Sequence, residues 1–91
     1  MHYVLFYEVV DDYVEKRTPF RPEHLALASE AAQQGELLLG GALAEPADGA
    51  MILFRSHEAA ESFAKNDPYV HNGLITKWTV RKWNTVAGSL L

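Results

Sequence analysis

The sequence predicts an α+β fold of the ferredoxin-like type, with the element order βαββαβ and two helices on one face of a four-stranded antiparallel sheet. Three observations predict it. Four segments have the composition of strands, two carry helix-capping signals, and the six follow one another as two similar halves. With 91 residues and no low-complexity segment, the chain is expected to form a single domain over residues 1–91.

The first strand and the first helix lie in the N-terminal third. Residues 2–10, HYVLFYEVV, are mostly β-branched or aromatic, and both faces of the expected strand are mostly apolar. A polar stretch from Asp11 to Thr18 follows. Residues 22–34 are expected to form a helix, because Pro22 suits the first helical position and Gly35 suits the cap that ends a helix.

The second half of the chain repeats this order with an added strand. ELLLGGALAE at 36–45 and AMILFR at 50–55 flank the turn PADG, which predicts a hairpin. Ser56 is a typical N-cap for a second helix, which the Asn-Asp-Pro sequence at 66–68 ends. The turn-rich segment PYVHNG then leads into the fourth strand, GLITKWTVRKW at 73–83.

One face of this sheet has no helix to cover it, because right-handed crossovers place both helices on the other face. Either choice of inward face in the first strand leaves at least three large apolar side chains pointing outward. Large exposed apolar patches usually mark interaction sites, and burial contributes roughly 25 cal/mol per Å². We therefore expect a homodimer that packs sheet against sheet, with internal space near the strand ends and helix starts, where His24 lies.

The composition excludes several partners and ligands. Eight lysines and arginines against twelve aspartates and glutamates give a net charge of −4 without a basic run, so no nucleic acid is expected. Glu8, Asp11 and Asp12 interrupt the opening apolar residues, so we expect neither a signal peptide nor a membrane span, and the cytoplasm is the expected location. There is no cysteine, the four histidines lack ligand spacing and no nucleotide-binding motif is present, so no metal and no cofactor are expected.

His24 is the candidate base. It lies in the first turn of the expected helix, where the helix dipole disfavours a positive imidazole and favours the neutral form that accepts a proton. A half-exposed histidine that merely tolerates the helix start beside Glu23 is the alternative. Taken alone, the residues favour that alternative.

Asp67, at the end of the second expected helix, is the candidate partner of His24. A carboxylate there can accept the imidazole N–H, hold its tautomer and steady the imidazolium after proton capture. Asp-Pro is also a common turn opening in which the carboxylate caps the following N–H groups. Tyr69 is a candidate cavity lid or proton donor, with ordinary aromatic packing as the alternative.

Four further residues are candidates for substrate binding. Arg17 and Arg21 suit the binding of a carboxylate or phenolate, and they equally suit solvated loop positions. Gly40 and Gly41 interrupt the second strand, which indicates a bulge or a place where a ligand approaches the backbone closely.

Three stretches of the chain resemble the YciI-like family, also called the YCII-related domain. They are EKRTPFRPEHLALA at 15–28, GELLLGGAL at 35–43 and EAAESFAKNDPYVHNGL at 58–74, and with the closing strand they cover nearly the whole chain. The R-P-x-H-L and N-D-P-Y-V pieces are the most specific. The resemblance implies a dimeric α+β barrel whose active site uses the histidine and the aspartate of these pieces, here His24 and Asp67.

The resemblance also implies a kind of chemistry. The family is similar in architecture to muconolactone isomerases, and dehydrochlorination of a chlorinated hydroxyquinol is one activity associated with it. We expect a small cofactor-independent enzyme in which His24 and Asp67 serve proton transfer, in isomerisation or elimination, on a small cyclic or aromatic-derived metabolite. The alternative is a non-catalytic dimer that binds a small molecule or serves as a scaffold. A haem-degrading or cofactor-free monooxygenase with buried Trp78 and Trp83 is a related option.

Overall fold

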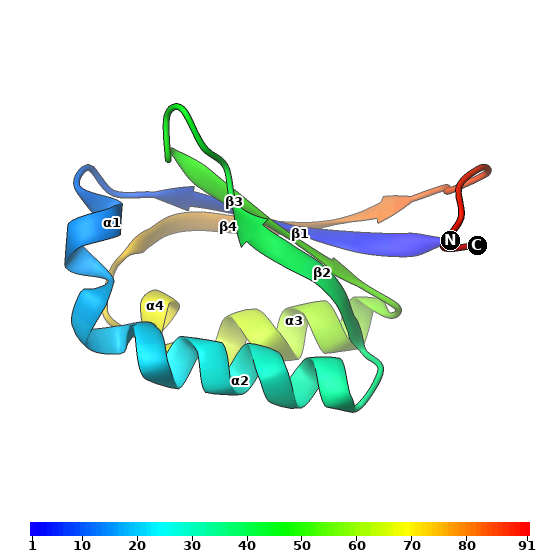
Figure 1. Cartoon of the computed structure of the whole chain (residues 1–91), viewed down its shortest axis with the longest axis horizontal. Helices are drawn as coiled ribbons and strands as arrows, with labels where there is room; N and C mark the ends of the chain where they lie inside the picture. The colour runs from blue at the N-terminus through cyan, green and yellow to red at the C-terminus, as the bar shows by residue number, and fades with distance from the viewer.

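Four antiparallel strands form one sheet: β1 (His2–Val9), β2 (Leu37–Ala42), β3 (Gly49–Phe54) and β4 (Ile75–Trp83). Their spatial order is β2–β3–β1–β4, so β1 and β3 are the inner strands (Figure 1). The structure is a computed structural model and describes residues 1–91. The order of the strands and their antiparallel pairing are those of the ferredoxin-like fold, which confirms the predicted fold class.

Two long helices lie on one face of this sheet (Figure 1). α2 spans Arg21–Gln33, one residue earlier than predicted, and α3 spans His57–Asn66. The Ser56 hydroxyl caps α3 by accepting a hydrogen bond of 3.1 Å from the backbone N–H of Ala59. Gly35 ends α2 with φ at 76°, a left-handed conformation that glycine adopts without strain. No helix combines the length and the apolar character that crossing a membrane requires.

Two short helices lie where the sequence predicts only polar or turn segments. α1 (Tyr13–Lys16) is followed by a 3₁₀ turn, η1 (Thr18–Phe20), and α4 (Pro68–His71) follows α3. Each short helix contains a buried tyrosine, Tyr13 in α1 and Tyr69 in α4, and the two rings meet edge to face with centroids 5.8 Å apart. A single anchoring ring leaves no hydrophobic periodicity in the sequence, which is why the pattern does not reveal these turns.

The core lies between the sheet and the helices. Inward residues of β1 and β3, among them Leu5, Ile52 and Phe54, pack there against α3, which contributes Phe63. No residue of α2 is fully buried, although Leu27 packs partly against the core. Because α2 does not seal against the sheet along its length, space remains between them.

The opposite face of the sheet is apolar and has no helix over it. Leu39, Met51 and Trp83 are 59%, 41% and 52% exposed there, beside Val4. Only Trp78 packs against the core, whereas Trp83 lies on this open face, so the single chain does not bury both tryptophans that the related monooxygenase option names.

Candidate active site

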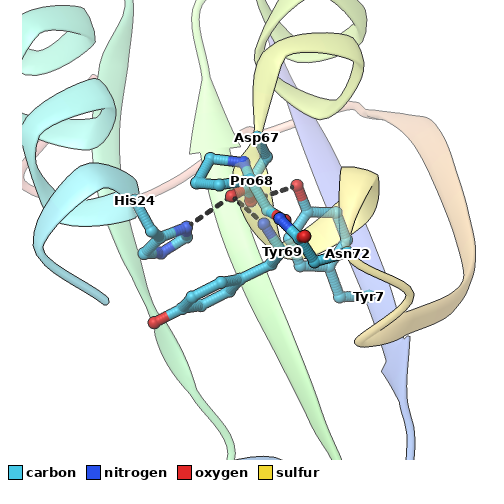
Figure 2. A network of polar contacts seen from close by, with 6 residues as sticks. All are labelled: Tyr7, His24, Asp67, Pro68, Tyr69 and Asn72. Atoms are coloured by element: carbon cyan, nitrogen blue, oxygen red, sulfur yellow. Dashed lines mark hydrogen bonds and ion pairs between the residues drawn. The ribbon is translucent and has the colours of Figure 1, made fainter. Parts of the chain in front are cut away.

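Asp67 is the centre of a buried polar cluster (Figure 2). Its side chain is 0% exposed. Oδ2 accepts a hydrogen bond of 2.7 Å from the Tyr7 hydroxyl, while Oδ1 accepts one of 3.0 Å from the backbone N–H of Tyr69. Oδ1 also lies 2.8 Å from Nδ1 of His24. Three groups converge as donors on one side chain, which suits an ionised carboxylate because that form only accepts hydrogen bonds.

Three elements that are far apart in the sequence position this cluster. Tyr7 comes from β1, His24 from the first turn of α2, and Asp67 from the junction of α3 and α4. Pro68 opens α4, and Asp67 before it is extended, with φ −75° and ψ 123°, so that its carboxylate caps the N–H of Tyr69. The sequence left turn-capping and histidine-pairing as alternatives for Asp67. The carboxylate has both contacts.

The imidazole of His24 is held by a hydrogen bond at its edge and by an aromatic ring on its face. Its imidazole stacks flat on the Tyr69 ring, with centroids 3.8 Å apart and planes 5° apart, and the Phe63 ring meets it edge-on at 5.9 Å. The side chain is 16% exposed. Because the carboxylate of Asp67 accepts at Nδ1, the proton of the neutral imidazole lies there. The lone pair is therefore on Nε2, the nitrogen that Asp67 does not contact.

A cavity of about 290 Å³ opens beside His24, between α2 and the sheet. It lies at the small end of ligand-pocket volumes and has room for one ring. Its wall contains no aspartate or glutamate. Every residue that the sequence singled out, apart from Asp67 behind the wall, lines this cavity: Arg17, Arg21, His24, Gly40, Gly41 and Tyr69. Most of the remaining wall is apolar, from Leu25, Ala28, Leu37, Ala42, Ala50, Ile52 and Phe63, with Tyr7 and Tyr13 completing it.

The two glycines of β2 do not form the bulge that the sequence suggested as one alternative. The register of β2 against β3 shifts between Leu37 and Leu39, before the glycines. A Cβ on Gly40 would lie 3.2 Å from Cγ2 of Ile52, a tight contact at the cavity wall, whereas one on Gly41 would have no neighbour within 4 Å. The absence of a side chain therefore matters for packing at Gly40 and not at Gly41.

Tyr7 belongs to the cluster although the sequence did not single it out. Burial raises the pKa of Tyr7 well above its ordinary value, and the negative charge of Asp67 and the hydrogen bond to it raise that pKa further. The hydroxyl therefore remains a donor at neutral pH. The available signal was a hydroxyl-bearing residue at an inward position of an apolar strand. Tyr3 is a second hydroxyl-bearing residue on the same face of this strand, so the pattern alone does not select Tyr7.

A larger hollow, of about 520 Å³, lies between α2 and α3. Its rim carries Glu30, Glu36 and Glu58, and it contains neither His24 nor Asp67. Although this hollow is larger, it is not the candidate site, because no histidine paired with a carboxylate lies in its wall. No group of three or more histidine, aspartate and glutamate side chains gathers in the structure as a metal site would require.

Comparison with known proteins places the chain in a family. The profile of the YCII-related domain matches residues 1–84. Protein YciI from Escherichia coli O6:H1 and protein YciI from Shigella flexneri are each 32% identical to this chain, over 94% of it and 99% of their own length. An uncharacterised protein from Haemophilus influenzae is 28% identical over the same shares.

A solved structure has the same fold. It is 5-chloro-2-hydroxyhydroquinone dehydrochlorinase (TftG) from Burkholderia phenoliruptrix AC1100, in complex with 2,5-dihydroxybenzoquinone. It superposes with a TM-score of 0.73 at 19% sequence identity, covering 92% of this chain and 94% of that one. The profile match and the identities to protein YciI together show that this chain belongs to the YciI-like family of YCII-related domains.

Proposed function

We propose that this chain is a small enzyme without a cofactor, in which His24 is the general base acting on a small cyclic or aromatic-derived metabolite. One observation carries the proposal: an imidazole whose Nδ1 lies 2.8 Å from a fully buried carboxylate stands at the wall of a one-ring cavity. Asp67 contacts His24 and not the cavity, so it is a positioning residue. Arg17, Arg21 and Tyr69 bind the substrate, and the backbone at Gly40 and Gly41 closes the wall.

The proposed reaction begins with proton removal. The Nε2 lone pair takes a proton from a C–H or O–H group of the substrate, and the electron pair of that bond moves into the ring system. In an elimination, the pair forms a new double bond and a leaving group departs with its own electron pair. In an isomerisation, the imidazolium returns the proton to another atom of the ring, so that neither route requires an external oxidant or reductant.

Two contacts support the imidazolium that proton transfer creates. The carboxylate of Asp67 lies against Nδ1 and balances the new positive charge. The face of Tyr69, parallel to the imidazole at 3.8 Å, attracts a cation through the quadrupole of its ring. Both contacts also fix the plane of the imidazole and thereby the direction of the Nε2 lone pair.

The size of the expected effect limits what His24 alone contributes. General-base assistance accelerates reactions by about 10²- to 10⁴-fold, and orienting the substrate in a water-poor cavity contributes the remainder. The dehydrochlorinase with the same fold supports a ring-shaped substrate, since its structure holds 2,5-dihydroxybenzoquinone. A cavity of about 290 Å³ fits a molecule of that size.

The test is turnover of a panel of hydroxylated and chlorinated quinols, read as chloride release and as uptake of deuterium from solvent. We expect His24→Ala to lower kcat by about 10²-fold or more. His57→Ala is the matched control, because His57 is exposed, outside the cavity, and pairs only with Glu61 on its own helix. Full turnover in His24→Ala removes the base assignment. Ligand binding without turnover, unaffected by Asp67→Asn, favours a binding module instead.

We also propose that the chain forms a homodimer through the open face of its sheet. Leu39, Met51 and Trp83 are all about half exposed on that face, beside the apolar Val4 and Leu53. A monomer would leave this surface in water, and covering it with a second copy removes the exposure.

A further inference from the structure

The hydroxyl of Tyr69 lacks a hydrogen-bond partner. Tyr69 is 1% exposed, and its oxygen is the one buried side-chain polar atom in the chain without a partner. The backbone N–H of the same residue is satisfied by Asp67, so the unpaired group is at the far end of the ring. In Figure 2 this oxygen points away from Asp67, beyond the imidazole of His24. A buried hydroxyl without a partner is costly and rare, and this one belongs to a residue of the cavity wall.

The charges around this hydroxyl are positive. Arg17 and Arg21 line the same cavity, and neither forms an ion pair with a carboxylate of the chain. Burial and the neighbouring Tyr13 raise the pKa of Tyr69, while the positive charges of Arg17 and Arg21 oppose that rise. No side chain, Arg21 included, lies in hydrogen-bond geometry with the Tyr69 oxygen.

The cavity therefore differs from the rest of the molecule in charge. The whole chain has a net charge of −4, yet the cavity wall carries two arginines and no acidic residue. Arg17 lies over the ring of Tyr13, 5.2 Å from its centroid, and neither arginine has a carboxylate partner. Two such arginines in a mostly apolar wall favour an anion, and their planar groups match the geometry of a carboxylate or phenolate oxygen. A doubly charged phosphate group is less well suited, because most of the wall is apolar and cannot solvate its second charge.

We propose that the cavity selects a planar, single-ring anion, whose negatively charged oxygen accepts a hydrogen bond from Tyr69 and lies beside Arg17 and Arg21. The charged oxygen belongs to a carboxylate or to an ionised phenol or enol. The other end of the ring then lies toward Nε2 of His24, and this second statement rests on the proposed function. The anion subsite itself does not depend on catalysis.

Calorimetry with benzoate and benzamide tests the subsite, because the two probes have nearly the same shape and differ in charge. We expect the wild-type protein at low salt to bind benzoate about tenfold more tightly than benzamide or better. Tyr69→Phe keeps the ring that stacks on His24 and removes only the hydroxyl, and we expect it to reduce this preference about threefold to tenfold. Arg21→Gln should reduce it as well.

Tyr3→Phe is the matched control for the loss of a tyrosine hydroxyl, because Tyr3 lies outside the cavity and its hydroxyl contacts only the sulfur of Met1. We expect Tyr3→Phe to keep the full preference for benzoate. Tyr69→Phe should unfold at the same denaturant concentration as the wild type or a higher one, since the hydroxyl has no partner to lose. This result separates a ligand-binding hydroxyl from a structural one.

A second probe distinguishes the two kinds of anionic oxygen. 4-Nitrophenol absorbs visible light only when ionised, so a site that prefers the phenolate lowers its apparent pKa and deepens the colour at a fixed pH. A shift with 4-nitrophenol but no preference for benzoate assigns the subsite to a phenolate, and the reverse assigns it to a carboxylate. The proposal is overturned if the wild type shows neither effect, or if Tyr69→Phe keeps the full preference for the anion.

Two measurements distinguish a wrong anion subsite from a wrong assignment of His24 as the base. We expect His24→Gln to lose turnover and to keep the preference for the anion. If His24→Ala keeps full turnover while benzoate still binds preferentially, the base assignment falls and the anion subsite stands. If benzoate and benzamide bind equally and 4-nitrophenol shows no shift, while His24→Ala loses turnover, the anion subsite falls and the base assignment stands.

Discussion

The rings of His24 and Tyr69 lie parallel with their centroids 3.8 Å apart, and both residues donate a hydrogen bond to the same carboxylate oxygen, Oδ1 of Asp67. His24 reaches this atom through Nδ1, and Tyr69 reaches it through its backbone N–H. The stack prevents the imidazole from turning about its bond to Asp67, and Asp67 prevents it from sliding off the stack. The direction of Nε2 is therefore fixed by the stack on Tyr69 together with the hydrogen bond to Oδ1.

Asp67→Asn should impair turnover more than binding. The amide keeps the hydrogen bonds of this cluster with its oxygen in the place of Oδ1, because the backbone N–H of Tyr69 also donates to that atom and cannot accept. Its NH₂ group then faces the Tyr7 hydroxyl, so the imidazole proton stays on Nδ1 while the negative charge beside it is lost. We expect kcat to fall by about 10- to 10²-fold, with a smaller change in KM, because the neutral amide no longer balances the imidazolium. Nitrogen NMR of His24 should show an unchanged tautomer in this variant, and a kcat within about threefold of the wild type contradicts the charge-balancing role of Asp67.

Tyr7→Phe should destabilise the protein and leave the other residues of the site in place. It removes the donor that lies 2.7 Å from Oδ2 of Asp67, and a buried hydrogen bond to a charged group contributes about 1.5–3 kcal/mol. The free energy of unfolding, measured with urea, should fall by that amount. The control is Tyr3→Phe, whose hydroxyl contacts only the Met1 sulfur and which we expect to stay within about 0.5 kcal/mol of the wild type. Equal stabilities for the two variants would show that the Tyr7 contact contributes nothing.

The difference between these two tyrosines shows what the sequence can and cannot predict. The strands, the two long helices and the pairing of His24 with Asp67 follow from capping residues, alternation and two short family motifs. Tyr3 and Tyr7 occupy equivalent positions in the alternation of β1, and only the packing of α3 and α4 onto the sheet brings Tyr7 to Asp67, 60 residues away. The parallel stack of Tyr69 on His24 likewise depends on α4, which has no hydrophobic periodicity of its own.

Alkaline pH should destabilise the protein through Tyr7. Its folded-state pKa is raised, mainly by burial and then by Asp67, while the unfolded chain ionises near pH 10. The stabilising contribution is therefore complete below about pH 10 and is lost as the pH rises from there toward the folded-state pKa, by up to about 1.4 kcal/mol per pH unit. Urea unfolding between about pH 9 and pH 11 measures this slope, which should be smaller in Tyr7→Phe. The same slope in both proteins would assign the alkaline loss to other groups.

Met51→Lys should separate the proposed dimer. Met51 lies on the open face of β3, 41% exposed, opposite Phe6 of β1 and Gly41 of β2 in the sheet register. Two copies packed through this face would bury the new ammonium groups with no acidic partner, since the charged neighbours in the same hollow, Arg81 and Lys82, are both positive. Light scattering after size-exclusion chromatography should give twice the chain mass for the wild type and the single mass, 10.2 kDa, for Met51→Lys.

Met51→Leu is the matched control, because it keeps the volume and the apolar surface, and it should remain dimeric. The circular dichroism of Met51→Lys must stay that of a folded chain for the comparison to hold, and the surface position of Met51 favours this outcome. A wild-type protein that elutes as a monomer at high concentration contradicts the dimer directly. A dimer that survives in folded Met51→Lys contradicts an interface that covers Met51, because packing a second sheet over this residue would bury the new ammonium group.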